Sequence, residues 1–384
     1  MNKKVVPILL AFMCMGFGDA VGPFVGLAKA EFELSNFLAM IIPFMGFIMF
    51  GLLSVPMGIF QDKHTKKKTL VLGLIVALVG LSIPVFGIKH FVLFLLTVLL
   101  LGAGATILQV AGNPIMRDVS REGQYSRNLS IGQFVKAIGS LAGPIIPAVA
   151  AAWFGADWKV IFPIFVAGII ITLVSVLTTH IEESKEADKE PTTFSSSLQL
   201  LSNKYVAMMV FGIFIYVGSE VCMSSGIPLY LEDNFGVNIE KMGVLGTGLF
   251  FTTLMIGRFF GGLILNWLKP QKFFIITSIT GVIGILGLFV GTASVAVVSV
   301  IIIGLSFANV FPLIFSITVD QMPEKTNELS GLMITAIVGG AIIPPIMGFV
   351  QDMTTVSLGF LVPLAAFLYI TGIAFKNRKI VEKD

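Results

Sequence analysis

Charged residues are scarce in this sequence. Asp, Glu, Lys and Arg together make up only 12% of the 384 residues, about half of the fraction that soluble globular domains carry. Histidine and cysteine are rarer still, at three and two residues, so the sequence shows no cluster with the spacing of a metal site and no pairing of a nucleophile with a base. We therefore predict that the chain is neither an ordinary soluble domain nor an enzyme, and that it uses no metal and no cofactor.

The sequence instead contains many long apolar runs. Apolar residues make up 56% of the chain, and a membrane-spanning helix needs ~20 of them in succession, with few interruptions. Twelve runs of about this length predict an all-α integral membrane protein with twelve transmembrane helices in a lipid bilayer. The runs lie at 5–29, 37–60, 69–87, 91–116, 128–152, 159–179, 204–230, 241–266, 273–290, 294–318, 331–349 and 357–375.

Lysine and arginine predict the orientation of these helices. Nineteen of them fall in one set of alternate loops and termini, four fall in the opposite set, and two, Lys136 and Arg258, lie inside the runs. Because basic residues collect on the cytoplasmic side, both termini are expected in the cytoplasm, in the inner membrane of a bacterium. The net charge is only +3, and the basic residues are spread over one membrane face, so the sequence does not indicate binding to nucleic acid.

One polar stretch divides the chain. Residues 180–203 are poor in apolar side chains and mixed in charge, which is typical of a solvated linker. We therefore expect an N-terminal six-helix bundle at 1–179, a cytoplasmic linker at 180–203 and a C-terminal six-helix bundle at 204–384, in a chain that acts as a monomer.

The two halves resemble each other at an offset of about 200 residues. "GIFQDKHTKKK" (58–68) follows the second run and "GLILNWLKPQK" (262–272) follows the eighth, while "AIGSLAGPIIP" (137–147) has a counterpart in "AIVGGAIIPP" (336–345). Parallel repeats of six spans, with the substrate site between the halves, are a transporter architecture. Four residues near the cytoplasmic ends of spans are expected to act as gate or latch residues; they are Asp62, Asp118, Arg258 and Asp320.

A second set of polar residues lies deeper in the spans. Ionisable groups at membrane depth are costly and mark functional sites, and Asp19, Lys136 and Glu220 lie there, in the first, fifth and seventh runs. Asp19 is a candidate proton carrier, with a structural ion pair as the alternative. The candidate substrate-binding residues are Gln109, Asn113, Gln133, Lys136, Glu220 and Asn309.

Lys136 is the least expected of these residues. It lies three positions after Gln133, so the two share one helix face, which has to face a polar cavity or another helix. Pairing with Asp19 and direct contact with substrate both remain open for it.

Several of these stretches carry a family resemblance. "LQVAGNP" (108–114), "RNLSIGQFVKAIGS" (127–140), "YVGSEV" (216–221), "FPLIFS" (311–316) and "GGAIIPPIMG" (339–348) resemble motifs of the fucose/glucose–galactose permease branch of the major facilitator superfamily. The resemblance implies two six-helix bundles, alternating access and proton-coupled uptake of a monosaccharide. It also matches Asp19 and Pro23 to the acidic residue and the proline of the family's first span.

The sequence departs from that pattern within the site itself. Gln109 stands where fucose permease has a titratable glutamate, Lys136 where the family has a sugar-contacting asparagine, and Gly18 where it has another asparagine. The expected function is therefore import of a monosaccharide or a related small polar solute with a proton. Two alternatives stay open: transport of a sugar acid or other small organic anion clamped by Lys136, and passive sugar uniport.

Overall fold

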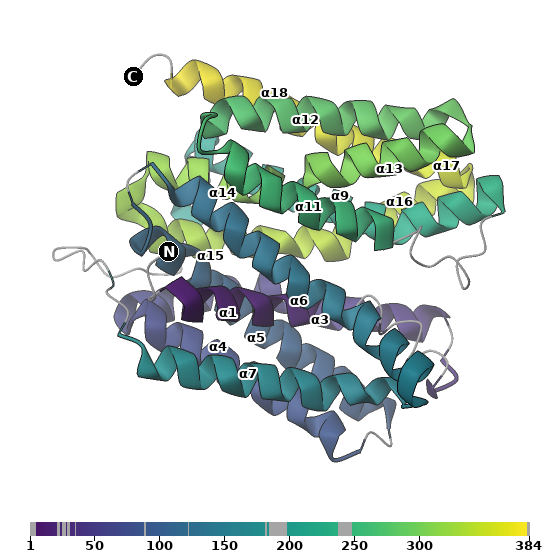
Figure 1. Ribbon diagram of the computed structural model, residues 1–384. Coiled ribbons are helices and arrows are strands. Elements are labelled where there is room, and N and C mark those ends of the chain that lie inside the picture. The colour runs from purple at the N-terminus through teal and green to yellow at the C-terminus, as the bar shows by residue number, and fades with distance from the viewer. Residues whose placement is uncertain are drawn as a thin grey trace. The chain divides into compact units, whose positions relative to one another are not determined.

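The computed structural model describes residues 5–20, 24, 28, 31–34, 36–87, 90–121, 123–180, 183, 198–236 and 248–381 (Figure 1). Throughout these ranges the ordered elements are helices, and no strand occurs. The predicted all-α fold class is thereby confirmed. Pro23 and most of the expected linker fall outside the described residues.

The helices gather into two compact units. The first contains residues 1–121, 135–199 and 324–335, and the second contains 122–134, 200–323 and 336–384. These units differ from the expected halves in two segments, since 122–134 packs with the later part of the chain and 324–335 with the earlier part. The units group residues by packing, whereas the halves group them by repeat, so the predicted bundle boundaries stay a prediction.

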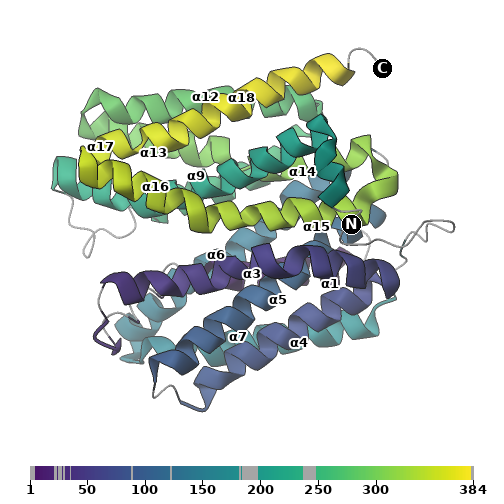
Figure 2. The same ribbon diagram turned by 180° about the vertical axis from the view of Figure 1, so that it is seen from behind.

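In the first unit, α5 is the central helix. It packs against α1, α3, α4 and α15, while α7 packs against α1 and α4 (Figures 1 and 2). The elements of this unit are α1 (Val6–Gly16), η2 (Phe17–Ala20), α3 (Asn36–Lys63), α4 (Lys66–Val85), α5 (Phe91–Asp118), the part of α6 (Tyr125–Phe154) from Val135 onward, η3 (Trp158–Val160), α7 (Ile161–Thr178) and α15 (Thr326–Thr335).

In the second unit, α9 packs against α14, α16 and α18 (Figure 2), and α13 packs against both α11 and α12 (Figure 1). Its elements are the start of α6, η4 (Leu200–Ser202), α9 (Lys204–Phe235), α11 (Leu249–Ile264), α12 (Pro270–Gly287), η6 (Leu288–Val290), α13 (Ala293–Phe307), α14 (Val310–Gln321), η8 (Ala336–Val338), α16 (Gly339–Met353), α17 (Val356–Gly359) and α18 (Leu361–Val381). The turn η7 (Pro323–Lys325) lies at the boundary of the two units.

The described helices match the twelve apolar runs one for one. Ten stretches are long and apolar enough to cross a membrane, and two shorter apolar helices, Val6–Asp19 and Leu249–Ile264, correspond to the first and eighth runs. The tenth run, 294–318, corresponds to the span Ala293–Gln321, which is interrupted because α13 ends at Phe307 and α14 begins at Val310.

Glycine allows the helices of the first unit to approach closely. A Cβ atom on Gly102 of α5 would lie 2.8 Å from the Cα of Gly46 on α3, and one on Gly104 would lie 2.8 Å from the backbone nitrogen of Ala77 on α4. Both separations are shorter than a carbon contact of about 3.5–4.0 Å. Small residues at such crossings are typical of membrane helices. Lipid is as apolar as the side chains, so these helices associate through close van der Waals packing and not through the hydrophobic effect.

Candidate functional site

Asp19 lies where the first span stops being a regular α-helix. α1 ends at Gly16, and the next four residues, Phe17–Ala20, form the 3₁₀ turn η2 that carries Asp19. Short 3₁₀ turns of this kind are frequent at the ends of α-helices. The Asp19 side chain is 30% exposed, so it is reachable from outside the protein even though it lies within an apolar span.

Two groups from α6 hold the Asp19 carboxylate. The Lys136 ammonium lies 3.2 Å from Asp19 Oδ2, and the Ser140 hydroxyl donates to the same oxygen at 2.8 Å. Lys136 and Ser140 are four residues apart and therefore share a face of α6. The pairing of Lys136 with Asp19, which the sequence left open, is thus present in the structure.

A glycine crossing brings these groups together. A Cβ atom on Gly16 of α1 would overlap the Lys136 carbonyl oxygen and lie 2.7 Å from the Ser140 nitrogen. A Cβ atom on Gly139 of α6 would overlap the Met13 carbonyl oxygen. The backbones of α1 and α6 are therefore in direct contact one turn from Asp19, and this contact fixes the distance between Asp19 and α6.

A small cavity adjoins Asp19 within the first unit. Its volume is about 10 Å³, which is roughly the space that one water molecule needs. Asp19 supplies the only carboxylate of its lining, and the other lining residues are small or aromatic: Gly18, Gly46, Phe47, Phe50, Gly102 and Ala105. Asp19 therefore has polar partners on α6 and an apolar cavity lined by α3 and α5.

Three predicted site residues are buried amides of α5 and α6. Gln109 and Gln133 are each 2% exposed and Asn113 is fully buried. Among the described residues, no hydrogen-bond partner is found for Gln109 Oε1 or Gln133 Nε2. Buried polar atoms nearly always have a partner in the protein or in ordered water, so each of these two atoms has unused capacity for one hydrogen bond.

The second unit has its own buried ion pair. Arg258 Nη2 on α11 lies 3.2 Å from Glu220 Oε1 on α9, with side-chain exposures of 7% and 20%. Arg258 Nε also donates to the Ala308 carbonyl at 3.3 Å. Arg258, expected from the sequence to be a gate residue, thus has a backbone carbonyl and the carboxylate of Glu220 as partners, although Glu220 was expected to contact the substrate.

Asn309 lies at the interruption of the tenth span. It is 1% exposed, and its side-chain amide donates to the Gly257 carbonyl of α11 at 2.8 Å. Among the described residues, no partner is found for its side-chain oxygen. Asn309 thus joins the gap between α13 and α14 to α11.

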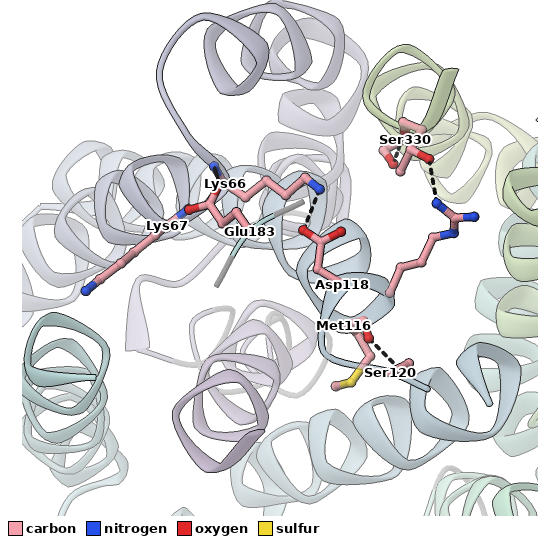
Figure 3. Close-up of polar contacts among 9 residues, drawn as sticks. Lys66, Lys67, Met116, Asp118, Ser120, Glu183 and Ser330 are labelled. Atoms are coloured by element: carbon pink, nitrogen blue, oxygen red, sulfur yellow. Dashed lines mark hydrogen bonds and ion pairs between the residues drawn. The ribbon is translucent and has the colours of Figure 1, made fainter. Parts of the chain in front are cut away.

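Three of the four expected gate residues lie at or near helix ends, whereas Arg258 lies in the middle of α11. Asp118, at the end of α5, forms an ion pair of 2.5 Å with Lys66 at the start of α4, and both side chains are less than one-tenth exposed (Figure 3). Asp62 is half-buried near the end of α3, and Asp320 is exposed near the end of α14. Their gate roles stay predictions.

Sequence analysis missed two features of these sites. Ser140 was not named, although its position four residues after Lys136 puts it on the same face of the helix. Glu183 was also missed: its two carboxylate oxygens accept hydrogen bonds from the backbone amides of Lys66 and Lys67 at 2.8 and 2.9 Å (Figure 3). Nothing in the local sequence indicates that contact, because Glu183 is more than 110 residues away from both lysines along the chain.

No group of three or more His, Cys, Asp or Glu side chains that could hold a metal ion occurs within the described residues. Besides the Lys66–Asp118 pair at the helix ends, the described part of the chain has two ion pairs inside its apolar spans, Asp19–Lys136 and Glu220–Arg258, each within one unit.

Comparison with known proteins gives consistent results. A family model described as Major Facilitator Superfamily matches residues 8–345. The chain is 28% identical to a glucose/galactose transporter of Brucella abortus biovar 1 (strain 9-941), over 89% of this chain and 86% of that one. It is 22% identical to the L-fucose-proton symporter of Escherichia coli (strain K12), over 89% and 85%.

Among solved structures, the fold is similar to that of the major facilitator transporter FucP in the outward conformation. The TM-score is 0.84, with 20% sequence identity, and the match covers 98% of this chain and 99% of that one.

Proposed function

The chain belongs to the Major Facilitator Superfamily, and from that membership we propose that it imports a neutral monosaccharide together with a proton, by alternating access of two six-helix bundles, 1–179 and 204–384. It is a multi-pass membrane transporter and not an enzyme. The proposal places a monomer in the bacterial cytoplasmic membrane with both termini in the cytoplasm, as the distribution of basic residues favours.

The observation that carries the proposal is the contact of Asp19 with Lys136 and Ser140. Asp19 and Lys136 together have no net charge, so this pair presents no excess charge that would attract an ion. The hydroxyl groups of a sugar can both donate and accept hydrogen bonds, so they can replace Asp19 as the partner of Lys136 and of Ser140.

Proton binding and the ion pair exclude each other. A proton on Asp19 removes the counter-charge of Lys136, and a cation left alone at that depth is costly. The sugar lowers this cost by solvating the ammonium through its hydroxyl groups, so sugar binding and protonation of Asp19 favour each other. This reciprocal coupling is what symport requires.

The same geometry supports a second candidate substrate. Once Asp19 is protonated, Lys136 is a cation without a counter-ion, which a carboxylate would satisfy better than a hydroxyl. A sugar acid carried with one proton would then be an electroneutral cargo. Gln109 and the other polar candidates, Asn113, Gln133, Glu220 and Asn309, are proposed to contact the hydroxyl groups that both substrates share.

Galactose and galacturonate separate the two candidates, because they differ only in having an alcohol or a carboxylate at C6. Binding of each to the purified wild type and to Lys136→Asn is the test. The neutral-sugar proposal expects galactose binding in the wild type that Lys136→Asn retains. Acid binding in the wild type that Lys136→Asn loses would support the carboxylate clamp instead.

The variant Asp19→Asn tests whether Asp19 carries the transported proton. In vesicles with an imposed pH gradient, the variant should lose uphill uptake and keep exchange of labelled for unlabelled sugar, because amide and carboxylic acid have similar shapes but only the acid carries a proton. Normal accumulation by Asp19→Asn would show that Asp19 is not the proton carrier. Wild-type uptake that does not respond to the gradient would favour uniport.

A further inference from the structure

The interruption of the tenth span has a cause in the sequence. Ala308 and Asn309 separate α13 from α14, and Asn309 has φ −113° and ψ 0°, outside the α-helical range. Pro312 has no amide hydrogen, so it cannot donate to the Ala308 carbonyl four residues earlier. A backbone carbonyl without a partner at membrane depth is costly, so the Ala308 carbonyl needs a donor from elsewhere.

That donor is Arg258 from the eighth span. Its Nε donates to the Ala308 carbonyl at 3.3 Å, and the adjacent Phe307 carbonyl accepts a hydrogen bond from the Tyr216 hydroxyl at 2.8 Å. Arg258 and Tyr216 are both buried. The interruption is therefore held by side chains of α9 and α11, and not only by its own helix.

The other end of Arg258 is bonded to Glu220. Nη2 lies 3.2 Å from Glu220 Oε1, and the guanidinium is a rigid plane, so its Nε and Nη2 donors cannot move independently. Glu220 is 20% exposed, whereas Arg258 is 7% exposed. A ligand can therefore reach Glu220 more easily than it can reach the interruption behind Arg258.

We propose that Arg258 is a positioning residue that links Glu220 to the interruption of the tenth span. When the carboxylate of Glu220 turns to a ligand hydroxyl, Arg258 loses that partner, its plane shifts, and the Ala308 carbonyl is released. The ligand part of this inference rests on the proposed sugar transport. The link between Glu220 and Ala308 does not depend on any ligand.

Hydrogen–deuterium exchange of the full chain in detergent tests the link without ligand. The readouts are the Ala308 amide, bonded to Gly304 O at 3.2 Å, and the Leu313 amide, bonded to Asn309 O at 3.0 Å. Glu220→Gln should speed their exchange about fivefold or more, because a neutral acceptor holds Arg258 less firmly than a carboxylate. Asp233→Asn, an exposed carboxylate on the same helix, is the matched control and should leave the exchange unchanged.

Arg258 variants separate linkage from simple stabilisation. Arg258→Gln should speed exchange at the same two amides, and Glu220→Gln added to it should have no further effect. Arg258→Lys keeps the charge but lacks the planar guanidinium, so it should also abolish the effect of Glu220→Gln. This variant replaces Arg258→Gln in the test if Arg258→Gln does not fold. An effect of Glu220→Gln that persists in both Arg258 backgrounds, or is absent in the wild type, overturns the link.

Galactose in excess is the ligand test. In the wild type it should change exchange at Ala308 and Leu313 at least threefold, and in Arg258→Lys it should not. Galactose binding without this change overturns the ligand part of the inference and leaves the proposed function intact. If galactose does not bind, galactose is not the monosaccharide of the proposed function, and the result with Glu220→Gln still decides the link.

Discussion

Replacement of Gly139 by alanine tests whether the crossing of α1 and α6 sets the Asp19 site. The added Cβ atom would overlap the Met13 carbonyl oxygen, lie 3.0 Å from the Met13 carbonyl carbon and lie 3.3 Å from the Gly16 Cα. Carbon atoms pack at about 3.5–4.0 Å, so the two helices have to separate by roughly 0.5–1 Å. The Lys136–Asp19 separation, 3.2 Å in the structure, would then reach about 4 Å and exceed hydrogen-bonding distance.

The expected loss of stability is modest, but the loss of function is large. Overpacking costs about 1–3 kcal/mol, and the higher helix propensity of alanine returns up to about 1 kcal/mol. We expect a fall of about 1–2 kcal/mol in the free energy of unfolding and a fall of about tenfold or more in uphill sugar uptake, because small misplacements at a site can reduce rates by that much or more.

Gly372→Ala in α18 is the matched control. A Cβ atom there meets nothing within 4 Å, so this variant should be as stable as the wild type or slightly more stable, with unchanged uptake. Thermal unfolding in detergent and uptake into vesicles are measured on both variants. If Gly139→Ala is as stable and as active as Gly372→Ala, the crossing does not control the site and the reasoning is wrong.

Two further predictions concern the helix ends in Figure 3. Asp118→Asn should lower the free energy of unfolding by about 3 kcal/mol, because it leaves the buried Lys66 ammonium without its counter-charge. The double variant Asp118→Asn with Lys66→Met should recover part of that loss in thermal unfolding, and no recovery would contradict the buried-charge explanation. Glu183→Gln should cost about 1 kcal/mol, because one amide oxygen replaces two carboxylate oxygens at the N-terminus of α4. A thermal midpoint equal to that of the wild type would show that this cap does not stabilise the protein.

The membrane-spanning architecture was predictable because it depends on local composition. A helix in lipid satisfies its own backbone hydrogen bonds, so each apolar run of sufficient length indicates a span without knowledge of its neighbours. The twelve runs therefore correspond to described helices, including the short α1 and α11. The interruption at Ala308 and Asn309 was not predicted, although Pro312 was a signal for it.

The sequence predicted which residues belong to the site better than it predicted which of them are in contact. Asp19, Lys136, Glu220 and Arg258 stand out in the sequence because ionisable groups at membrane depth are rare. Their pairing into Asp19–Lys136 and Glu220–Arg258 depends on which helices cross, and helix crossing depends on contacts between residues far apart in the chain. Spacing within one run carries no information about those contacts.

Composition and order along the chain thus determined that this protein is helical, that it crosses the membrane many times and which polar residues it buries. The tertiary structure alone decided which charges neutralise each other and what Arg258 holds in place. The physical reason is the separation along the chain between the residues that interact. A hydrophobic run acts through its own neighbours, whereas an ion pair at 3.2 Å exists only because two glycines, Gly16 and Gly139, let the backbones of α1 and α6 touch.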